Sequence, residues 1–441
     1  MINKLHKFYK RIQIYLANTS WIMGEKIVVM GLGFLVTVIL ARYLGPEQFG
    51  ILSYAISLVA LFGVAGHVGL SGLVIRELVK EPENKQVIMG TSFALKGAGY
   101  LIGLILVLLV AFLTEPMNSV EFWVLVIVAF SLVFKPFDVI DFWFQSRLEA
   151  KYTAISRTLA TVVSSAFQLV LVFVSANLVM LAAAHLVQAT LTVLLLVSFF
   201  FIKSKLNIKS WQFSKNKAKE LFSQGWVVFL GSIFAVIYLK IDQVMLKWLV
   251  GAEEVGIYAV AATLSEAWYF VPVAIVASFF PKLIKLKEHD PTLFHHRLQQ
   301  LFDFLFILAL GVAIVVAFLA QPIITIFFGE SYIGAASILV VHIWSAVFVF
   351  LRAGFRNWMF IENMLMFSLI THGIGALVNV ALNFWLIPQF GGLGAAYATL
   401  LAYATASYIA LLFHSKTRVV FIMMTKSIFS PVRYLLFIKG N

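Results

Sequence analysis

The sequence contains no cysteine among its 441 residues, which excludes disulfide bonds, thiolate metal ligands and a cysteine nucleophile. Charged residues are also scarce: aspartate, glutamate, lysine and arginine together make up 12% of the chain, whereas a soluble domain has about 25%. So few charges cannot form a water-facing surface. The rest of the composition, 62% hydrophobic with a mean hydropathy of +0.97, indicates an integral membrane protein.

The apolar residues occur in runs of about 20, which is the length of a helix that crosses a hydrocarbon core. We therefore predict an all-α integral membrane protein with twelve transmembrane helices. The expected spans are approximately 19–42, 51–75, 87–112, 122–144, 154–174, 178–202, 222–250, 255–281, 299–320, 333–356, 364–387 and 392–414.

Lysine and arginine outnumber acidic residues by 33 to 20, and they are concentrated in alternate connections between the spans. If the chain crosses the membrane twelve times, 27 of the lysines and arginines lie on the side of the N-terminus, and only Arg42 and Lys247 lie in the opposite loops. This asymmetry follows the positive-inside rule and predicts a multi-pass protein with both termini in the cytoplasm. We expect neither a cleaved signal peptide nor nucleic-acid binding, because the basic start leads into a long span and the charge lies in loops.

A short segment recurs at half the chain length. The sequence Tyr-Leu-Gly-Pro-Glu-Gln-Phe-Gly-Ile at 43–51 matches Leu-Val-Gly-Ala-Glu-Glu-Val-Gly-Ile at 249–257, so that Gly45 corresponds to Gly251 and Gly50 to Gly256. The repeat predicts two pseudo-symmetric six-helix bundles around a central cavity, because parallel repeats are related by an axis along the membrane normal. The expected parts are an N-lobe at 1–202, a basic cytoplasmic linker at 203–221, a C-lobe at 222–414 and a cytoplasmic amphipathic tail at 415–441.

Charged residues inside the spans are candidate functional residues, because a charge at mid-bilayer costs at least ~2.5 kcal/mol on insertion scales. Cations in a wet cavity attract an anion such as a phosphate, and a buried carboxylate can carry a proton. The expected substrate-binding residues are Lys26, Lys96, Lys240 and Arg42, and the expected ion-coupling residues are Asp242, Glu266 and Glu25. The alternative is helix-to-helix pairing that fixes the packing. Lys135 and Asp138 lie three residues apart on one helix face, and for them a local ion pair carries the same weight as a functional role.

Other motifs are missing or weak. No Walker loop, HExxH motif or Ser-His-Asp set occurs, so we expect neither direct ATP drive nor an enzyme. The scattered histidines lack paired metal spacing, so we expect no metal and no cofactor. Pro136 and Pro272 lie inside expected spans and predict kinks.

Several segments have the order and spacing found in a known family. They run from Ala41 to Ala55, Asp141 to Gln145 with Glu149 and Lys151, Lys240 to Leu246, Glu266 to Pro272 and Ser278 to Lys282, followed by Asn379, Asn383 and Gly391 to Tyr397. Through these segments the sequence resembles the O-antigen type of polysaccharide-unit flippase within the MATE-like MOP exporter superfamily. The resemblance covers about residues 18–414 and implies two six-helix bundles with a central cationic cavity.

The resemblance also implies a function. It implies an undecaprenyl-pyrophosphate-linked oligosaccharide as substrate, moved from the cytoplasmic to the outer leaflet by alternating access and driven by an ion gradient. The implied location is the bacterial cytoplasmic (inner) membrane, in O-antigen and lipopolysaccharide biosynthesis, with other polysaccharide-assembly membrane proteins as further candidate partners. The alternatives are a MATE-type cation-coupled drug exporter, a membrane-embedded polysaccharide polymerase or ligase, and a scaffold without transport.

Overall fold

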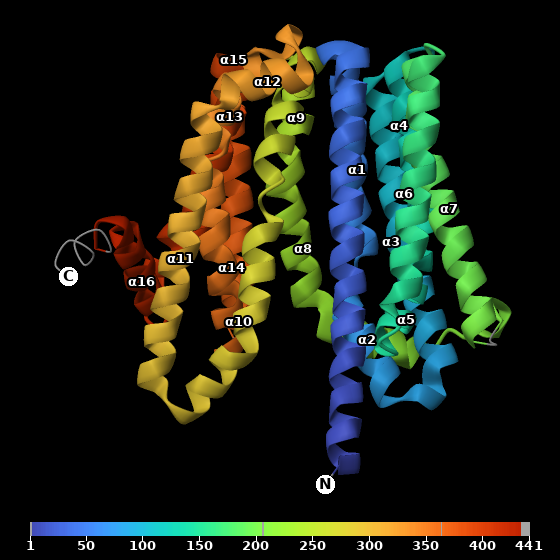
Figure 1. The fold of residues 1–441 in the computed structure, drawn as a ribbon. Coiled ribbons are helices and arrows are strands. Elements are labelled where there is room, and N and C mark those ends of the chain that lie inside the picture. Colours follow the sequence, from blue (N-terminus) through green and yellow to red (C-terminus); the bar gives the residue numbers. More distant parts are fainter. Residues whose placement is uncertain (1, 205–206, 363, 434–441) are drawn as a thin grey trace. The chain divides into compact units, whose positions relative to one another are not determined.

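The structure is a computed structural model that describes residues 2–204, 207–362 and 364–433. All regular secondary structure among these residues is α-helix or 3-10 helix, and no described residue lies in a β-strand (Figure 1). The chain divides into two compact units. Unit 1 takes in the described residues of Met1–Leu44 and Ala55–Ile233, and unit 2 those of Gly45–Tyr54 and Phe234–Asn441.

The helices of unit 1 are long and are joined by short turns. Its bundle is formed by α1 (Ile2–Gly63, of which 45–54 belong to unit 2), η1 (Val64–Gly66), α2 (Ser71–Lys80), η2 (Pro82–Asn84), α3 (Lys85–Thr114), α4 (Val120–Phe130), η3 (Ser131–Asp138), α5 (Val139–Ser146), α6 (Ala150–Phe173), α7 (Leu178–Ser204), η4 (Ile208–Ser210) and the first part of α8 (Lys215–Leu249).

The helices of unit 2 begin with the rest of α8. They continue with α9 (Ala252–Glu266), α10 (Phe270–His289), α11 (Pro291–Phe318), α12 (Ala320–Phe328), η5 (Glu330–Tyr332), α13 (Gly334–His342), α14 (Ser345–Ile361), α15 (Leu365–Ser407), η6 (Ile409–Phe413) and α16 (Arg418–Ile428).

The described residues contain ten segments that are long and apolar enough to cross a membrane. Two of them, Ala17–Lys80 and Met366–Phe413, each contain two of the expected spans. Their helices carry non-helical backbone at Gly45 and Gly391, one glycine in each. The all-α membrane class is confirmed, and the count of twelve stays a prediction.

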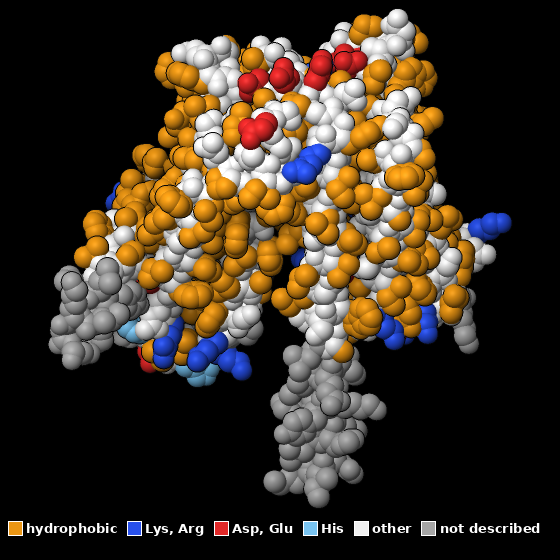
Figure 2. Space-filling view, turned by 45° about the horizontal axis from the view of Figure 1, so that its top comes forward, with side chains coloured by type: hydrophobic (Ala, Val, Ile, Leu, Met, Phe, Trp, Pro, Cys, Tyr) orange, Lys and Arg blue, Asp and Glu red, His pale blue; other side chains and the backbone are white. Residues whose placement is uncertain are grey.

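Large apolar side chains face outward. Phe173 and Phe318 are 90% and 85% exposed, and hydrophobic side chains cover most of the visible flank of unit 2 in Figure 2. In water such a surface would be unfavourable in proportion to its apolar area, whereas hydrocarbon tails solvate it at no cost. The exposure is therefore that of helices in lipid.

Four expected spans are interrupted near their middle. They are the second and fourth spans of each half of the chain, and the helical winding changes at 64–70, 131–138, 267–269 and 343–344. Pro136 lies in the 3-10 turn η3, where it produces the expected irregularity. Pro272 lies in the first turn of α10, where a missing N–H costs no helical hydrogen bond. Such breaks expose backbone groups that only polar partners or a cavity can satisfy.

The two copies of the repeated segment pack against each other inside unit 2. A methyl group on Gly50 would lie 1.8 Å from the carbonyl oxygen of Ala252, and one on Gly256 would lie 1.9 Å from that of Pro46. Each copy also contains a glycine with positive φ five residues before this contact, 71° at Gly45 and 124° at Gly251. Glycine therefore fills these positions because each turns the chain or lets two backbones touch.

The compact units differ in three places from the lobes expected from the sequence. Residues 45–54 join unit 2 through the contact just described, and residues 215–233 of α8 join unit 1. In addition, α16 of the expected tail packs against α11 in unit 2, with Val420 and Met424 fully buried (Figure 1). Within the expected tail, residues 434–441 lie outside the described residues.

Candidate functional site

Charged side chains from three helices meet in unit 1. Arg157 of α6 donates to the carboxylate of Asp141 of α5 at 3.0 Å, and its other terminal nitrogen lies 3.8 Å from the carboxylate of Glu25 of α1. Gln145 also donates to Asp141, at 3.0 Å. These residues and Lys26 line a cavity of about 220 Å³. Asp141 is therefore neither exposed nor unpaired, because Arg157 neutralises it.

Lys96 of α3 lies close to this cluster but has a different environment. Its side chain is 4% exposed, and its ammonium sits 5.3 Å from the centre of the Tyr100 ring and 5.2 Å from that of Phe142, the neighbour of Asp141. No described carboxylate oxygen lies within 4 Å of the ammonium. Aromatic faces attract a cation through their quadrupole, so the two rings hold Lys96 in place of an anion.

The expected local pair between Lys135 and Asp138 is not formed: the two side chains lie more than 4 Å apart, and both sit in the 3-10 turn η3. Arg42 lies sixteen residues beyond Lys26 on the same helix, which is a distance of about 24 Å at 1.5 Å per residue. It therefore lies at the far end of the first span and joins no cluster with Lys26.

In unit 2, Lys240 of α8 and Glu266 at the end of α9 form an ion pair of 3.5 Å. Both side chains are partly exposed, at 29% and 27%. The sequence placed these two residues in different roles, one binding an anion and one coupling to an ion. The ammonium of Lys240 neutralises the carboxylate of Glu266 at the point where the span is interrupted. A contact of this kind between α8 and α9 is the helix-to-helix pairing that the sequence left open as the alternative.

Asp242 is enclosed two residues further along α8, at 2% exposure. Its carboxylate accepts hydrogen bonds from the hydroxyl of Tyr258 at 2.7 Å, from the amide of Asn383 at 2.6 Å and from the hydroxyl of Thr399. All three donors are neutral. The charge of Asp242 is thus stabilised by hydrogen bonds alone, an arrangement in which a proton or small cation can be exchanged without breaking an ion pair.

A buried arginine in α14 adds a cation that sequence reasoning assigned to a cytoplasmic connection. Arg352 is 8% exposed and donates to the carbonyl of Ala406 at 2.8 Å and to the hydroxyl of Thr371 at 3.3 Å. No described carboxylate lies within 4 Å of it. Arg356, one turn further along, is exposed and equally without a carboxylate at that distance. The missed signal was their i, i+4 spacing at the end of an apolar helix.

The seven predicted residues thus divide between the units. Glu25, Lys26 and Lys96 gather in unit 1, and Lys240, Asp242 and Glu266 in unit 2, while Arg42 stands apart. The described part of the chain holds no group of three or more histidine, aspartate or glutamate side chains arranged to bind a metal ion. The polar groups described in the two units are thus ion pairs, hydrogen bonds from neutral donors, and cations that have no carboxylate within 4 Å.

Comparison with known proteins gives consistent relatives. The model of the family described as "Polysaccharide biosynthesis protein" matches residues 15–287. The putative O-antigen transporter of Shigella flexneri is 26% identical over 323 residues, which cover 69% of this chain and 73% of its own. The probable flippase AglR of Haloferax volcanii is 25% identical over 393 residues, which cover 88% of this chain and 80% of its own.

The fold also has a solved counterpart. The lipid II flippase MurJ in an inward closed conformation aligns with a TM-score of 0.70 over 96% of this chain and 93% of its own, at 15% sequence identity. At that identity the likeness concerns the fold alone. The predicted resemblance to polysaccharide-unit flippases is confirmed by the family match and the two relatives.

Proposed function

This chain belongs to the polysaccharide biosynthesis protein family, and from that premise we propose that it is a flippase for an oligosaccharide linked to undecaprenyl pyrophosphate. It moves this substrate from the cytoplasmic to the outer leaflet of the bacterial inner membrane by alternating access, and an ion gradient drives the movement. The name of the Shigella relative supports transport of an O-antigen, and the name of the Haloferax relative supports a flippase. The name of MurJ supports the flipping of a lipid-linked substrate on this fold.

The observation that carries the proposal is the sign of the charge left over inside each unit. The carboxylates of Glu25, Asp141 and Glu266 lie within 4 Å of an arginine or lysine. In contrast, Lys26, Lys96 and Lys135 in unit 1 have no described carboxylate within that distance, and Asp138 is the carboxylate there without a partner. Unit 2 leaves Arg352 and Arg356 as cations and Asp242 as a carboxylate without such a partner. In both units the charges without an ion-pair partner are therefore mostly cations, which suits a pyrophosphate.

The roles follow from these environments. Lys26, which lines the unit 1 cavity, and Lys96, which only aromatic rings hold, can turn toward an anionic group without leaving a carboxylate unpaired. Arg352 and Arg356 play that part in unit 2. The Lys240–Glu266 pair would open and close as the substrate's charge arrives and leaves. Asp242 is the ion-coupling residue, because neutral donors surround it.

The experiment that tests the function is deletion of the gene, followed by extraction of lipid-linked oligosaccharide and measurement of surface glycan. Loss of the flippase should make the lipid-linked intermediate accumulate on the cytoplasmic side while surface glycan falls. Normal surface glycan without accumulation would refute the proposal. Unchanged glycan together with increased sensitivity to cationic drugs would support the exporter alternative.

Complementation with single variants tests the site. Lys26→Ala and Lys96→Ala should each fail to restore surface glycan, because each removes a cation that the substrate phosphate needs, while membrane levels stay normal. Lys219→Ala is the matched control, since Lys219 is exposed at the start of α8 and forms no ion pair. Full restoration by both test variants would contradict the assignment of these lysines to the substrate.

A further inference from the structure

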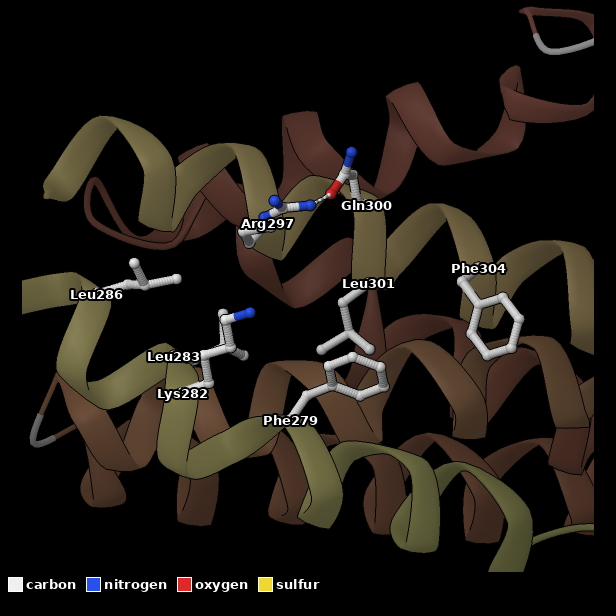
Figure 3. Close-up of a pocket in the computed structure, with 8 residues that line it drawn as sticks. All are labelled: Phe279, Lys282, Leu283, Leu286, Arg297, Gln300, Leu301 and Phe304. Carbon is white, nitrogen blue, oxygen red and sulfur yellow. Dashed lines mark hydrogen bonds between the residues drawn. The ribbon is translucent and has the colours of Figure 1, made fainter.

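The hairpin of α10 and α11 in unit 2 encloses a cavity of about 250 Å³. The side chains that line it come from both helices (Figure 3). Lys282 and Arg297 lie toward the end where the two helices join, together with Leu283 and Leu286, and Phe279 and Phe304 lie further from it. The cations of the cavity therefore lie at one end, and aromatic rings lie at the other.

The two cations of the cavity are not neutralised. Arg297 donates to the side-chain oxygen of Gln300 at 2.8 Å, and both residues line the cavity. No described carboxylate lies within 4 Å of Arg297 or Lys282. Of the acidic residues of the same hairpin, Asp290 accepts from the backbone N–H of Leu293 at 2.9 Å, and Asp303 accepts from Gln299 at 2.8 Å and from Ser427 at 2.9 Å. An anion would thus meet two cations without a carboxylate partner at one end of the cavity.

The surroundings strengthen the positive end. Figure 2 shows lysine, arginine and histidine side chains gathered where α10 and α11 join, below a largely hydrophobic flank. Lys285 of this group is exposed, as are His289, His295 and His296. By the charge distribution of the sequence, this end of the hairpin is on the cytoplasmic side. A basic pocket between transmembrane helices at that level is the arrangement that recognises anionic lipid head groups.

The apolar end selects against a free anion. The rings of Phe279 and Phe304 are each 51% exposed, so they border the cavity and continue onto the membrane-facing surface. A volume of about 250 Å³ equals roughly eight water molecules in the liquid. It is larger than a phosphate needs and too small for an oligosaccharide, and it matches a phosphodiester with the first carbons of an acyl chain.

From this geometry we propose that the α10–α11 cavity binds an anionic phospholipid of the cytoplasmic leaflet. The phosphate accepts hydrogen bonds from Lys282 and Arg297, and one acyl chain lies along Phe279, Leu301 and Phe304. The site lies within a single helical hairpin and is separate from the interior charges assigned to the transported substrate. The bound lipid holds the two helices together at the membrane surface.

Native mass spectrometry of the purified full-length protein with phosphatidylglycerol tests the site. Wild type should retain bound phosphatidylglycerol, and the double variant Lys282→Gln with Arg297→Gln should bind it roughly thirtyfold more weakly, at about 1 kcal/mol for each basic residue near the surface. The matched control is Lys215→Gln with Lys219→Gln, which removes two exposed lysines outside the cavity. It should bind like wild type, and so should Lys282→Arg.

Three outcomes would overturn the proposal. Equal affinity of the double variant and wild type would show that the cations are not used. Equal retention of zwitterionic phosphatidylcholine would show that the head-group charge is not read. Displacement of the lipid by inorganic phosphate at comparable concentration would show an anion site without an acyl-chain site. None of these depends on transport, so failure here would leave the flippase assignment in place.

Discussion

At the scale of single residues, Lys96 illustrates how a membrane span holds a cation without a carboxylate partner. A charge at mid-bilayer costs ~2.5–3.5 kcal/mol on insertion scales, and a desolvated cation–π contact returns ~2 kcal/mol. The rings of Tyr100 and Phe142 therefore offset much of the insertion cost. The anionic substrate proposed above would meet no existing ion pair at Lys96.

Asp242 gives the second residue-scale prediction. Asp242→Asn keeps the side-chain volume and removes the charge, so the protein should reach the membrane at normal levels but lose gradient-driven transport. Export of lipid-linked oligosaccharide, measured in vesicles with and without an imposed ion gradient, checks this. Tyr258→Phe removes one donor and leaves the carboxylate, so it should retain coupling at a reduced rate. Gradient-dependent export by Asp242→Asn would contradict the coupling role.

Gly256 gives a stability prediction. A methyl group there meets the backbone carbonyl of Pro46, which cannot move aside as a side chain can. Gly256→Ala should therefore cost about 2 kcal/mol or more of folding free energy and lower Tm in detergent by at least ~3 °C. Gly311→Ala is the control, because no atom lies within 4 Å of its added methyl, and it should leave Tm unchanged or raised. Equal Tm for both variants would contradict the close backbone contact.

Part of the residue pattern was predictable from sequence and part was not. Charges inside apolar runs identified Lys96, Asp242 and Glu266, because burial of charge is visible in hydropathy. The partners were hidden. Arg157 and Arg352 lie near the ends of expected spans, where a charge costs little, so they read as loop residues. Only the packing of separate helices brings Arg157 to Asp141 and buries Arg352.

At the scale of helices, the interruptions at 64–70 and 267–269 are the features that hydropathy does not register. The hydropathy of an apolar run is the same whether its helix is continuous or interrupted. A proline lies within only one of the four interruptions. At these breaks the backbone forms tighter turns, such as the hydrogen bond from the N–H of Tyr269 to the carbonyl of Glu266 at 2.9 Å. These places become the natural points for polar side chains such as Glu266 to reach a partner.

The attachment of α8 to α2 provides an element-scale prediction. Lys217 is 9% exposed and lies 2.7 Å from Glu77, 3.2 Å from Glu220 and 3.5 Å from Glu81. Lys217→Met would leave Glu77 buried without its main cation, at a cost of about 3 kcal/mol. Amide exchange of residues 215–225 should then become faster.

Two further variants separate the ion pair from general damage. The exposed Lys219→Met should not change amide exchange at the start of α8. The double variant Lys217→Met with Glu77→Gln should recover part of the protection, because it removes the uncompensated charge. Slow exchange in Lys217→Met alone would show that apolar packing, rather than the ion pair, fixes this end of α8.

At the scale of the whole molecule, composition was sufficient for the membrane class and the positions of the apolar segments. It was not sufficient for the division into compact units, because the boundary follows packing. Residues 45–54 pass to unit 2 through glycine contacts, and 215–233 are held in unit 1 by Lys217. Neither of these contacts can be predicted from the hydropathy profile or from the charge distribution along the sequence.

The count of twelve spans can be tested with introduced cysteines, since the natural chain has none. An impermeant maleimide should label Met117→Cys and Glu330→Cys in intact cells, and should label Lys285→Cys only after the membrane is opened. The reason is that twelve spans place the first two outside and the third inside. A single crossing within Ala17–Lys80 would put Met117 inside and reverse its labelling.

The contact between the two copies of the repeated segment has an evolutionary consequence. With an offset of 206 residues, Pro46 is the counterpart of Ala252 and Gly50 that of Gly256. Gly50 touches Ala252 and Gly256 touches Pro46, so each copy offers the other the same two positions. Such reciprocal contacts are characteristic of an isologous interface, in which the same surface patch of two subunits meets across a twofold axis. The reciprocal contact is the one that a homodimer would form, as expected if two copies of an ancestral chain were joined by gene duplication and fusion.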